Sequence, residues 1–315
     1  MALIDFKVLP GIDKQDTTSG AENRWVDCDN TRFRYGLPEK VGGWSSLITD
    51  TIVGVARREF AFVDLDGNRY VAIGTDKFLL IYFEGQLYDI TPLKTTLTSA
   101  TLATTNTSAI CSITTGTNHN LSVGDIVLLD TVTLPVGTGY VDADFENKLF
   151  QVTSITSATV FTITQSTAAT ATVGTGGSLS VKPYEQVGPA EQSYGYGWGI
   201  DTWSSGKWGE AASASDVSLE PGLWSLSNFG QVLVSTIANG KTFTWNAGDA
   251  ARLTTRASTT TSGFETTNNP TSTRVTLISP TTRHLIHFGT ETTIGDPTTQ
   301  DDMFIRFSDQ EDIND

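Results

Sequence analysis

Residues 223–248 read LWSLSNFGQVLVSTIANGKTFTWNAG, and this stretch decides the fold class. Its middle part, residues 231–237, is almost wholly apolar and β-branched, which predicts a strand covered on both faces. The pair 239–240 (Asn-Gly) is typical of a type I′ hairpin turn, in which both central residues need a positive φ. The next residues alternate, with Phe243 and Trp245 on one face and threonines on the other. The stretch therefore predicts a β-meander.

Two further stretches repeat this order of apolar strand, turn and aromatic-rich strand. Residues 69–83 read RYVAIGTDKFLLIYF, and residues 284–307 read HLIHFGTETTIGDPTTQDDMFIRF. Around the first of them, residues 51–93 contain four predicted strands, at 59–63, 69–75, 78–83 and 86–91. Four short antiparallel strands are the unit of a propeller blade. We therefore expect a first propeller blade at 51–93 and further blades within 183–315.

Residues 94–182 differ in composition from the rest of the chain. Thr/Ser/Ala-rich runs open and close this segment, and strand-like stretches lie between them, at 122–129 and 149–164. The blade-like pattern returns afterwards, so we expect a small β-barrel or β-sandwich inserted between blades. Residues 1–50 are expected to form an extended N-terminal segment, and residues 183–315 to begin with an aromatic loop.

The composition predicts an all-β protein and gives no support to metal or cofactor sites. Gly, Thr and Ser are abundant, and no long helical periodicity is present. Cys28 and Cys111 are far apart, which leaves zinc, iron–sulfur and disulfide frameworks without support. His284 and His287 are three residues apart on a predicted strand and therefore face opposite sides. We expect no metal site and no cofactor, and a surface position for His119.

The chain carries 20 basic and 35 acidic side chains, which gives a net charge of −15. A strongly basic face that grips nucleic acid is therefore not expected. An acidic surface keeps a protein soluble, and it also repels phosphate groups. No basic region followed by an apolar run begins the sequence, and no apolar run approaches the roughly 20 residues that cross a bilayer. We expect a soluble protein made in the cytoplasm.

The sequence contains no motif of a nucleotide-binding or hydrolytic enzyme. It has no GxxxxGK[ST], GxSxG or HExxH, and no GxGxxG between a strand and a helix. The enzymatic alternative is a propeller glycosidase, in which two carboxylates flank the sugar. The candidate acids for that chemistry are Asp201, Glu210, Asp216 and Glu220.

Four separated motifs, taken in order, resemble a known family. They are NRWVDCDNTRFRYGLPEKVGGW at 23–44, a Gly/Trp-rich stretch at 195–209, the meander at 223–245 and IRFSDQEDIND at 305–315. This order is similar to that in tail nozzle proteins of short-tailed bacteriophages, also called tail tubular protein B-like, and in the related tail hub family. The residues that carry the resemblance are Trp25, Arg32, Arg34, Gly36, Pro38, Lys40, Trp44, Trp198, Trp203, Trp208, Trp224, Asn228, Gly230, Gly240, Trp245, Asp309, Gln310 and Glu311.

The resemblance implies a structural virion protein and no enzyme. Members of this family form a hexameric ring in the phage tail, join a ring-shaped adaptor on the portal side, contact tail fibres and retain genomic DNA until ejection. For this chain it implies a nozzle or tail-tube subunit that passes DNA without sequence-specific binding, and acidic channel walls would favour that passage. A tail fibre or adhesin that binds host-surface glycans through the aromatic loop at 194–208 is the alternative.

The blade-like stretches amount to about three blades or partial blades, whereas a closed propeller typically has four to eight. We therefore expect the sheet edge at 303–308 to pair with β structure from beyond residue 315 or from another chain, because open edges invite aggregation. The aromatic loop at 194–208 is expected to pack at a blade edge or between subunits, where Trp and Tyr concentrate binding energy.

Overall fold

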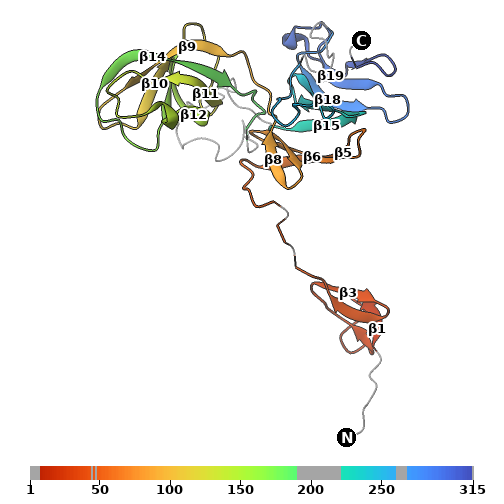
Figure 1. The fold of residues 1–315 in the computed structure, drawn as a ribbon. Helices are drawn as coiled ribbons and strands as arrows, with labels where there is room; N and C mark the ends of the chain where they lie inside the picture. Colours follow the sequence, from red (N-terminus) through yellow and green to blue (C-terminus); the bar gives the residue numbers. More distant parts are fainter. Residues whose placement is uncertain (1–7, 44, 47, 190–220, 260–267, 314–315) are drawn as a thin grey trace, which may run out of the picture. The chain divides into compact units, whose positions relative to one another are not determined.

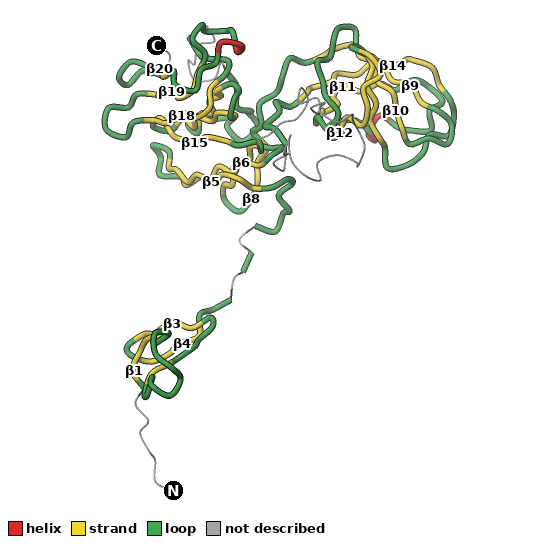
Figure 2. Tube along the Cα trace, turned by 180° about the vertical axis from the view of Figure 1, so that it is seen from behind, coloured by secondary structure: helices red, strands yellow, loops and turns green. Residues whose placement is uncertain are grey.

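The computed structural model describes residues 8–43, 45–46, 48–189, 221–259 and 268–313. The secondary structure of these residues is β apart from two short 3-10 helices, η1 (Asp142–Asp144) and η3 (Pro297–Thr299) (Figure 2). The chain divides into two compact units, Met1–Thr49 and Asp50–Asp315. The all-β class predicted from the sequence is confirmed.

The first unit contains four short strands: β1 (Leu9–Ile12), β2 (Arg24–Trp25), β3 (Thr31–Arg34) and β4 (Leu37–Lys40). β1 and β2 pair in parallel, and β3 and β4 form an antiparallel hairpin. Tyr35 and Gly36 make the hairpin turn, with φ values of 52° and 78°, as a type I′ turn requires. The segment expected to be extended therefore contains two small sheets.

Three antiparallel sheets of the second unit arise from the stretches with the repeated meander pattern. The first sheet consists of β5 (Ala56–Val63), β6 (Arg69–Thr75), β7 (Leu79–Phe83) and β8 (Gln86–Asp89). The second consists of β15 (Trp224–Phe229), β16 (Val232–Ile237) and β17 (Thr242–Asn246). The third consists of β18 (Thr273–Ile278), β19 (Leu285–Thr290) and β20 (Ile305–Phe307). In every sheet, strands adjacent in sequence are adjacent in space.

The three sheets lie face to face, with their first strands together. β15 of the second sheet contacts both β5 of the first and β18 of the third. Figure 1 shows these three strands one above another. Meanders that stack through their first strands are arranged like successive blades of a propeller, which agrees with the expected fold class.

An aromatic core joins the first and second sheets. The ring of Tyr70 stacks on Phe83 at 4.7 Å and meets Trp245 edge to face at 5.7 Å, measured between centroids. Phe62 approaches Trp245 at 6.4 Å in the same manner. All four rings are buried. Offset and edge-to-face pairs of this kind are the favoured aromatic geometries, so the core holds the two sheets in a defined orientation.

The middle strand β16 is covered on both faces, as its apolar sequence predicts, and five of its six residues are buried. On one side of this sheet, Phe243 and Trp245 enter the aromatic core. On the other side, the hydroxyl of Thr236 lies 2.8 Å from the hydroxyls of both Thr242 and Thr276. The third sheet thus meets the second through hydrogen-bonded threonines and through Val234, which packs with Leu285 and Ile278.

The type I′ turn predicted at Asn239 and Gly240 is wrong. Only Asn239 has a positive φ, of 59°. The N–H of Gly240 donates to the carbonyl oxygen of Ile237 at 2.9 Å, so the turn starts at Ile237 and has its positive φ at the third position, as in a type II turn. Gly240 instead pairs with the start of β18, which requires extended backbone. The I′ geometry occurs at Glu84 and Gly85, between β7 and β8.

A closed six-stranded barrel is inserted between the first and second sheets. The sequence predicted either a β-barrel or a β-sandwich here, and the structure contains the barrel. Its strands are β9 (Leu97–Thr104), β10 (Ile110–Thr114), β11 (Ile126–Thr133), β12 (Lys148–Ser157), β13 (Val160–Thr164) and β14 (Val173–Pro183). Their order around the barrel is β10-β13-β12-β11-β14-β9. The Thr/Ser/Ala-rich runs that open and close the segment contribute to the strands β9 and β14, which pair and close the barrel.

The predicted surface position of His119 is wrong, because the side chain is buried in the barrel. Its Nε2 lies 2.9 Å from the carbonyl oxygen of Ser157, and its Nδ1 accepts the N–H of Leu121 at 3.0 Å. Nδ1 is therefore the acceptor and Nε2 the donor of a neutral imidazole. The ring also meets Phe161 edge to face at 5.4 Å.

Candidate interaction site

The outer face of the third sheet, defined as the face turned away from the second sheet, is apolar. The strand register aligns its side chains in two cross-strand rows of three residues. Phe307 is 71% exposed and Ile305 is 52% exposed. A contiguous exposed apolar patch usually marks an interaction site. The rows are Val275, Phe288 and Ile305, and Leu277, Ile286 and Phe307.

The inner face of the same sheet is mixed, with a polar middle row and, beside it, Ile278 and Leu285 packed against Val234 of the second sheet. Thr276, His287 and Arg306 form the row between the two apolar rows and face the second sheet. Thr276 and His287 are buried. An antiparallel sheet with one solvated face normally places its apolar side chains inward and its polar side chains outward. In this sheet the outer face is apolar as well, which indicates that it is built to be covered.

Acidic side chains lie beside this outer face at both ends of β20. Asp301, Asp302, Asp309 and Glu311 are exposed at the two ends of β20. Within the described part of the chain, β20 pairs only with β19, so its other edge presents unpaired backbone groups. An unpaired edge beside an apolar face is a template for another β-strand.

Trp224 of the sequence motif fixes the second sheet to the first. Its indole Nε1 donates to the carbonyl oxygen of Thr75 at 2.8 Å. The ring lies against Gly74, where an added Cβ would be 2.5 Å from Cδ1 of Trp224. Because Gly74 has no side chain, the Trp224 ring can lie directly against its backbone, and a Cβ at this position would collide with the ring.

Trp245 of the motif is the centre of a buried polar chain. Its Nε1 donates to the carbonyl oxygen of Arg252 at 3.0 Å. The Nε of Arg252 in turn donates to the hydroxyl of Tyr70 at 2.8 Å, and that hydroxyl donates to Oδ2 of Asp64 at 3.2 Å. These contacts satisfy the polar atoms that the aromatic core buries.

The motif residues Asn228 and Gly230 lie close to the motif at 309–311. The side-chain amide of Asn228 donates to the carbonyl oxygen of Gly230 at 2.9 Å, and Gly230 has a φ of 63°. The guanidinium of Arg283 lies 4.5 Å from the centroid of the Phe229 ring. The backbone N–H of Glu311 donates to the carbonyl oxygen of Arg283 at 3.1 Å. Arg283 thus links two motifs that are far apart in sequence.

The motif residues of the first unit form local contacts. Trp25 lies 6.5 Å from the Phe33 ring, and Arg32 pairs with Glu39 across the hairpin at 3.1 Å. Tyr35 is 91% exposed. Arg34 lies over the Tyr35 ring at 5.4 Å, and Gly36, Pro38 and Lys40 belong to the same hairpin. The residues that fall outside the described part are Trp44, Trp198, Trp203, Trp208, Asp201, Glu210, Asp216 and Glu220.

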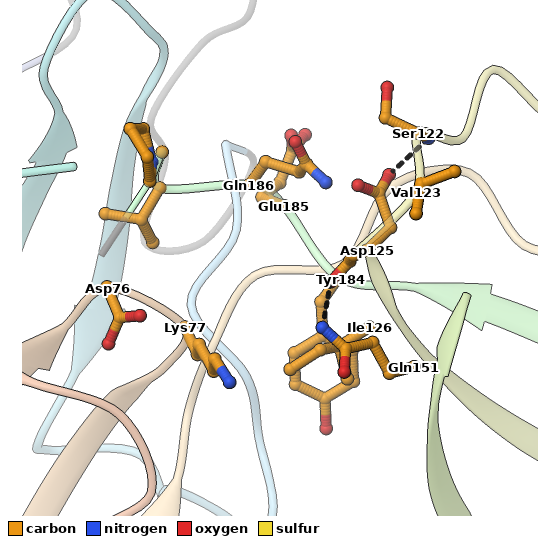
Figure 3. A pocket seen from close by; sticks show the side chains of 14 residues that line it. Asp76, Lys77, Ser122, Val123, Asp125, Ile126, Gln151, Tyr184, Glu185 and Gln186 are labelled. Carbon is orange, nitrogen blue, oxygen red and sulfur yellow. Dashed lines mark hydrogen bonds between the residues drawn. The ribbon is translucent and has the colours of Figure 1, made fainter. Parts of the chain in front are cut away.

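A pocket of about 730 Å³, which the sequence did not indicate, lies where the barrel joins the first sheet. Figure 3 shows Asp125 and Gln151 on the barrel wall, and Asp76 and Lys77 on the opposite wall. Oδ2 of Asp125 accepts the N–H of Ser122 at 3.0 Å, whereas Oδ1 has no hydrogen-bond partner. Burial raises the pKa of Asp125, because the charged form loses its hydration.

A cluster beside this pocket holds the barrel to the sheets. The hydroxyl of Tyr184, which follows β14, donates to Oδ2 of Asp89 at 2.6 Å. Arg256 donates to Asp89 at 3.0 Å and to the Tyr184 hydroxyl at 2.6 Å, and its guanidinium lies 4.7 Å from the Tyr184 ring centroid. Burial, reinforced by the charge of Asp89, raises the pKa of Tyr184, so the phenol stays protonated as a donor.

Two classes of site lack support in the described residues. They contain no group of three or more His, Cys, Asp or Glu side chains placed to hold a metal ion. None of the helices found in that part of the chain is long and apolar enough to cross a membrane.

Comparison with known proteins gives little further information. No family model matches the chain, and no curated protein matches it. A solved structure described as phage phi92 endosialidase is similar, with a TM-score of 0.23 and 13% sequence identity over 76% of this chain. This chain spans 35% of the endosialidase chain. A similarity at this level supports no inference about fold or activity.

Proposed function

We propose that this chain is a structural subunit of a bacteriophage tail, a nozzle or tail-tube component of the virion. The observation that carries the proposal is the exposed apolar outer face of the third sheet, around Phe307 and Ile305, beside the unpaired edge of β20. A contiguous exposed apolar face of this kind marks an interaction surface, so we infer that the chain acts as part of an assembly. The order of the four sequence motifs supports the assignment of that assembly to a phage tail.

The energetics of the outer face agree with an assembly role. Complete burial of a Phe, Ile, Leu or Val side chain stabilises by about 1.5–3 kcal/mol. Several such residues in one patch, among them Phe307 and Ile305, supply the apolar centre that a stable interface needs. A specific interface buries about 800 Å² on each partner, so the patch is the centre of a larger contact.

The proposed assembly is a homo-oligomeric ring, a hexamer by resemblance, that joins a portal-side adaptor and tail fibres. Its channel passes genomic DNA during ejection without sequence-specific contacts. The excess of 35 acidic over 20 basic side chains supports such a role, since negative walls do not retain phosphate groups. The role proposed for this chain is structural rather than catalytic.

The proposal is tested by removing the apolar centre of the face. We expect the wild-type protein to form a multi-subunit species in native mass spectrometry and the double variant Ile305→Ser, Phe307→Ser to form smaller species. The thermal midpoint of the variant should remain close to that of the wild type, because both side chains are exposed within the chain. Mass spectrometry of purified phage particles should detect the wild-type chain.

Leu65→Ser provides the matched control, because Leu65 is 82% exposed in the turn between β5 and β6, apart from the outer face. This control should assemble as the wild type does. A wild-type protein that stays monomeric at micromolar concentration would contradict the assembly role. Absence of the chain from purified particles would contradict the virion role.

A further inference from the structure

The outer face of the first sheet, defined as the face turned away from the aromatic core, is apolar as well. Tyr70 and Phe83 belong to the core. Val71 and Tyr82, their neighbours along β6 and β7, therefore point to the opposite side. The strand register joins them in a row that crosses all four strands. The row is Ala61, Val71, Tyr82 and Leu87, of which Ala61 is exposed and the others are half-buried.

The two outer faces are the ends of one stack of sheets. β15 contacts β5 on one side and β18 on the other, so the second sheet is covered on both faces (Figure 1). Stacked sheets of this kind pack through apolar side chains. A second copy that places its third sheet on the first sheet of its neighbour continues the packing that already exists within the chain.

Charge decides between this arrangement and a contact of two third sheets. Two third-sheet faces would bring together the four exposed acidic side chains at the ends of β20 from each copy, and such like charges repel. The strands β5 and β6 instead carry three arginines and one glutamate. Arg69 is exposed on the outer face, opposite Val63, which is 49% exposed. The acidic third sheet therefore matches the first sheet better than it matches itself.

A pocket beside β7 and β8 matches the most exposed ring of the third-sheet face. The pocket has a volume of about 540 Å³, and Leu80 and Leu87 of the sheet and Leu149 and Phe150 of the barrel line it. Stacking with the first strands together places β20, the third strand of its sheet, over β7, the third strand of the first sheet. Phe307 on β20, which is 71% exposed, is then the side chain that enters the pocket. Aromatic anchors in pockets carry much of the affinity of an interface.

We propose that the outer face of the third sheet packs on the outer face of the first sheet of a second copy, with Phe307 in the pocket beside β7 and β8. This contact rests on the proposed function and names the partner of its interaction site, which is another copy of the same chain. Because the contact uses two different faces, each copy keeps one of each kind for its neighbours. Head-to-tail contacts of this type generate closed rings, as the proposed tail subunit requires.

The test combines two variants of the complete chain, each altered on one face. Ile305→Ser, Phe307→Ser alters the third-sheet face, and Ala61→Glu places a carboxylate at the centre of the first-sheet face. Ala61 is exposed, so the glutamate is accommodated within the chain. In native mass spectrometry each variant alone should be monomeric. An equimolar mixture should form a dimer with one copy of each variant and nothing larger, because one intact face of each kind remains.

The mixed dimer also shows that both variants are folded, and far-UV circular dichroism of each variant checks this separately. Val136→Glu is the matched control for the added charge. Val136 is 97% exposed in the connection between β11 and η1 and belongs to neither sheet face. This control should assemble as the wild type does.

Two results would overturn the head-to-tail contact: assembly of Ala61→Glu to the wild-type subunit count, or a mixture of folded variants without the mixed dimer. Either result leaves the tail function standing, provided that the wild type assembles and occurs in purified particles. A monomeric wild type would instead overturn the assembly role and this contact together.

Discussion

His287 is buried in the polar inner row of the third sheet, where its Nδ1 lies 3.3 Å from the hydroxyl of Thr273. Burial lowers the pKa of His287 to about 4, and the positive charge of Arg306 contributes to the shift. In the unfolded chain the imidazole has its ordinary pKa of 6.5. Between pH 6.5 and about pH 4, the imidazole of His287 therefore stays neutral in the folded protein, whereas it is protonated in the unfolded chain.

We expect the stability of the third sheet to fall as the pH is lowered from 6.5 to about 4. The unfolded state binds the proton first, so the contribution of His287 is present above pH 6.5 and is lost as pH falls. The full loss is on the order of 3 kcal/mol. Urea unfolding of wild type and His287→Asn at neutral pH and at about pH 4.5 measures it.

The variant should lose less stability between the two pH values than the wild type, even though its stability at neutral pH is lower. His284→Asn serves as the control, because His284 lies three residues away on the other side of the strand. An equal pH dependence of wild type and His287→Asn would contradict the prediction.

At the residue scale, the sequence predicts burial well for large apolar side chains, because their own hydrophobicity drives it. Trp224 and Trp245 are motif residues in the sequence, and both lie in the core. His119 was placed wrongly, because its partners are the backbone groups of Ser157 and Leu121, and backbone partners leave no sequence signal. The unpaired Asp125 was missed for a related reason, since its environment depends on how the barrel meets the first sheet.

At the scale of elements, the inserted barrel, which runs from β9 to β14, has a hydrophobic core of its own. Its buried residues, such as Leu129, Phe145 and Phe161, pack among themselves. The low-complexity runs become strands because every second residue faces the barrel interior, as Ala100, Leu102 and Thr104 of β9 do. Sequence alone predicted the domain but not its closing strands, since Thr, Ser and Ala alternate without clear polarity.

We expect residues 94–184 to fold in isolation, because the six strands close on themselves and leave no edge. The fragment should give a β-type far-UV spectrum and a single cooperative unfolding transition. A shorter fragment, residues 105–170, lacks β9 and β14 and should remain unfolded. A disordered 94–184 fragment would show that the barrel needs the sheets for its stability.

The turns show how one element depends on another. The Asn-Gly pair at 239–240 has the composition of a type I′ turn, but Gly240 pairs with Thr273 of the third sheet and adopts an extended conformation. Glu84 and Gly85 adopt the I′ geometry, because a two-residue connection between β7 and β8 favours it. Local sequence therefore predicted the hairpins, while contacts distant in sequence decided the turn type.

At the scale of the whole molecule, the net charge of −15 governs encounters with nucleic acid. Phosphate contacts require Lys or Arg, and each contact adds to the salt dependence of binding. We expect no tight binding to a labelled DNA duplex at low ionic strength in a fluorescence anisotropy titration of the assembled protein. Tight binding that weakens steeply with added salt would contradict the proposed passage of DNA through an acidic channel.

The two ends of the inserted barrel are adjacent, and this determines how the chain can fold. Leu93 and Tyr184 form a β-bridge at the junction, and the N–H of Lys94 donates to the carbonyl oxygen of Pro183 at 2.8 Å. The contact between Trp224 and Thr75 spans 149 positions of sequence. A barrel that forms early shortens the effective loop to about 60 residues and lowers the entropy cost of closing it by about 0.8 kcal/mol. In kinetic terms, early folding of the insertion offsets the delay that its own length would otherwise add to the encounter of the two sheets.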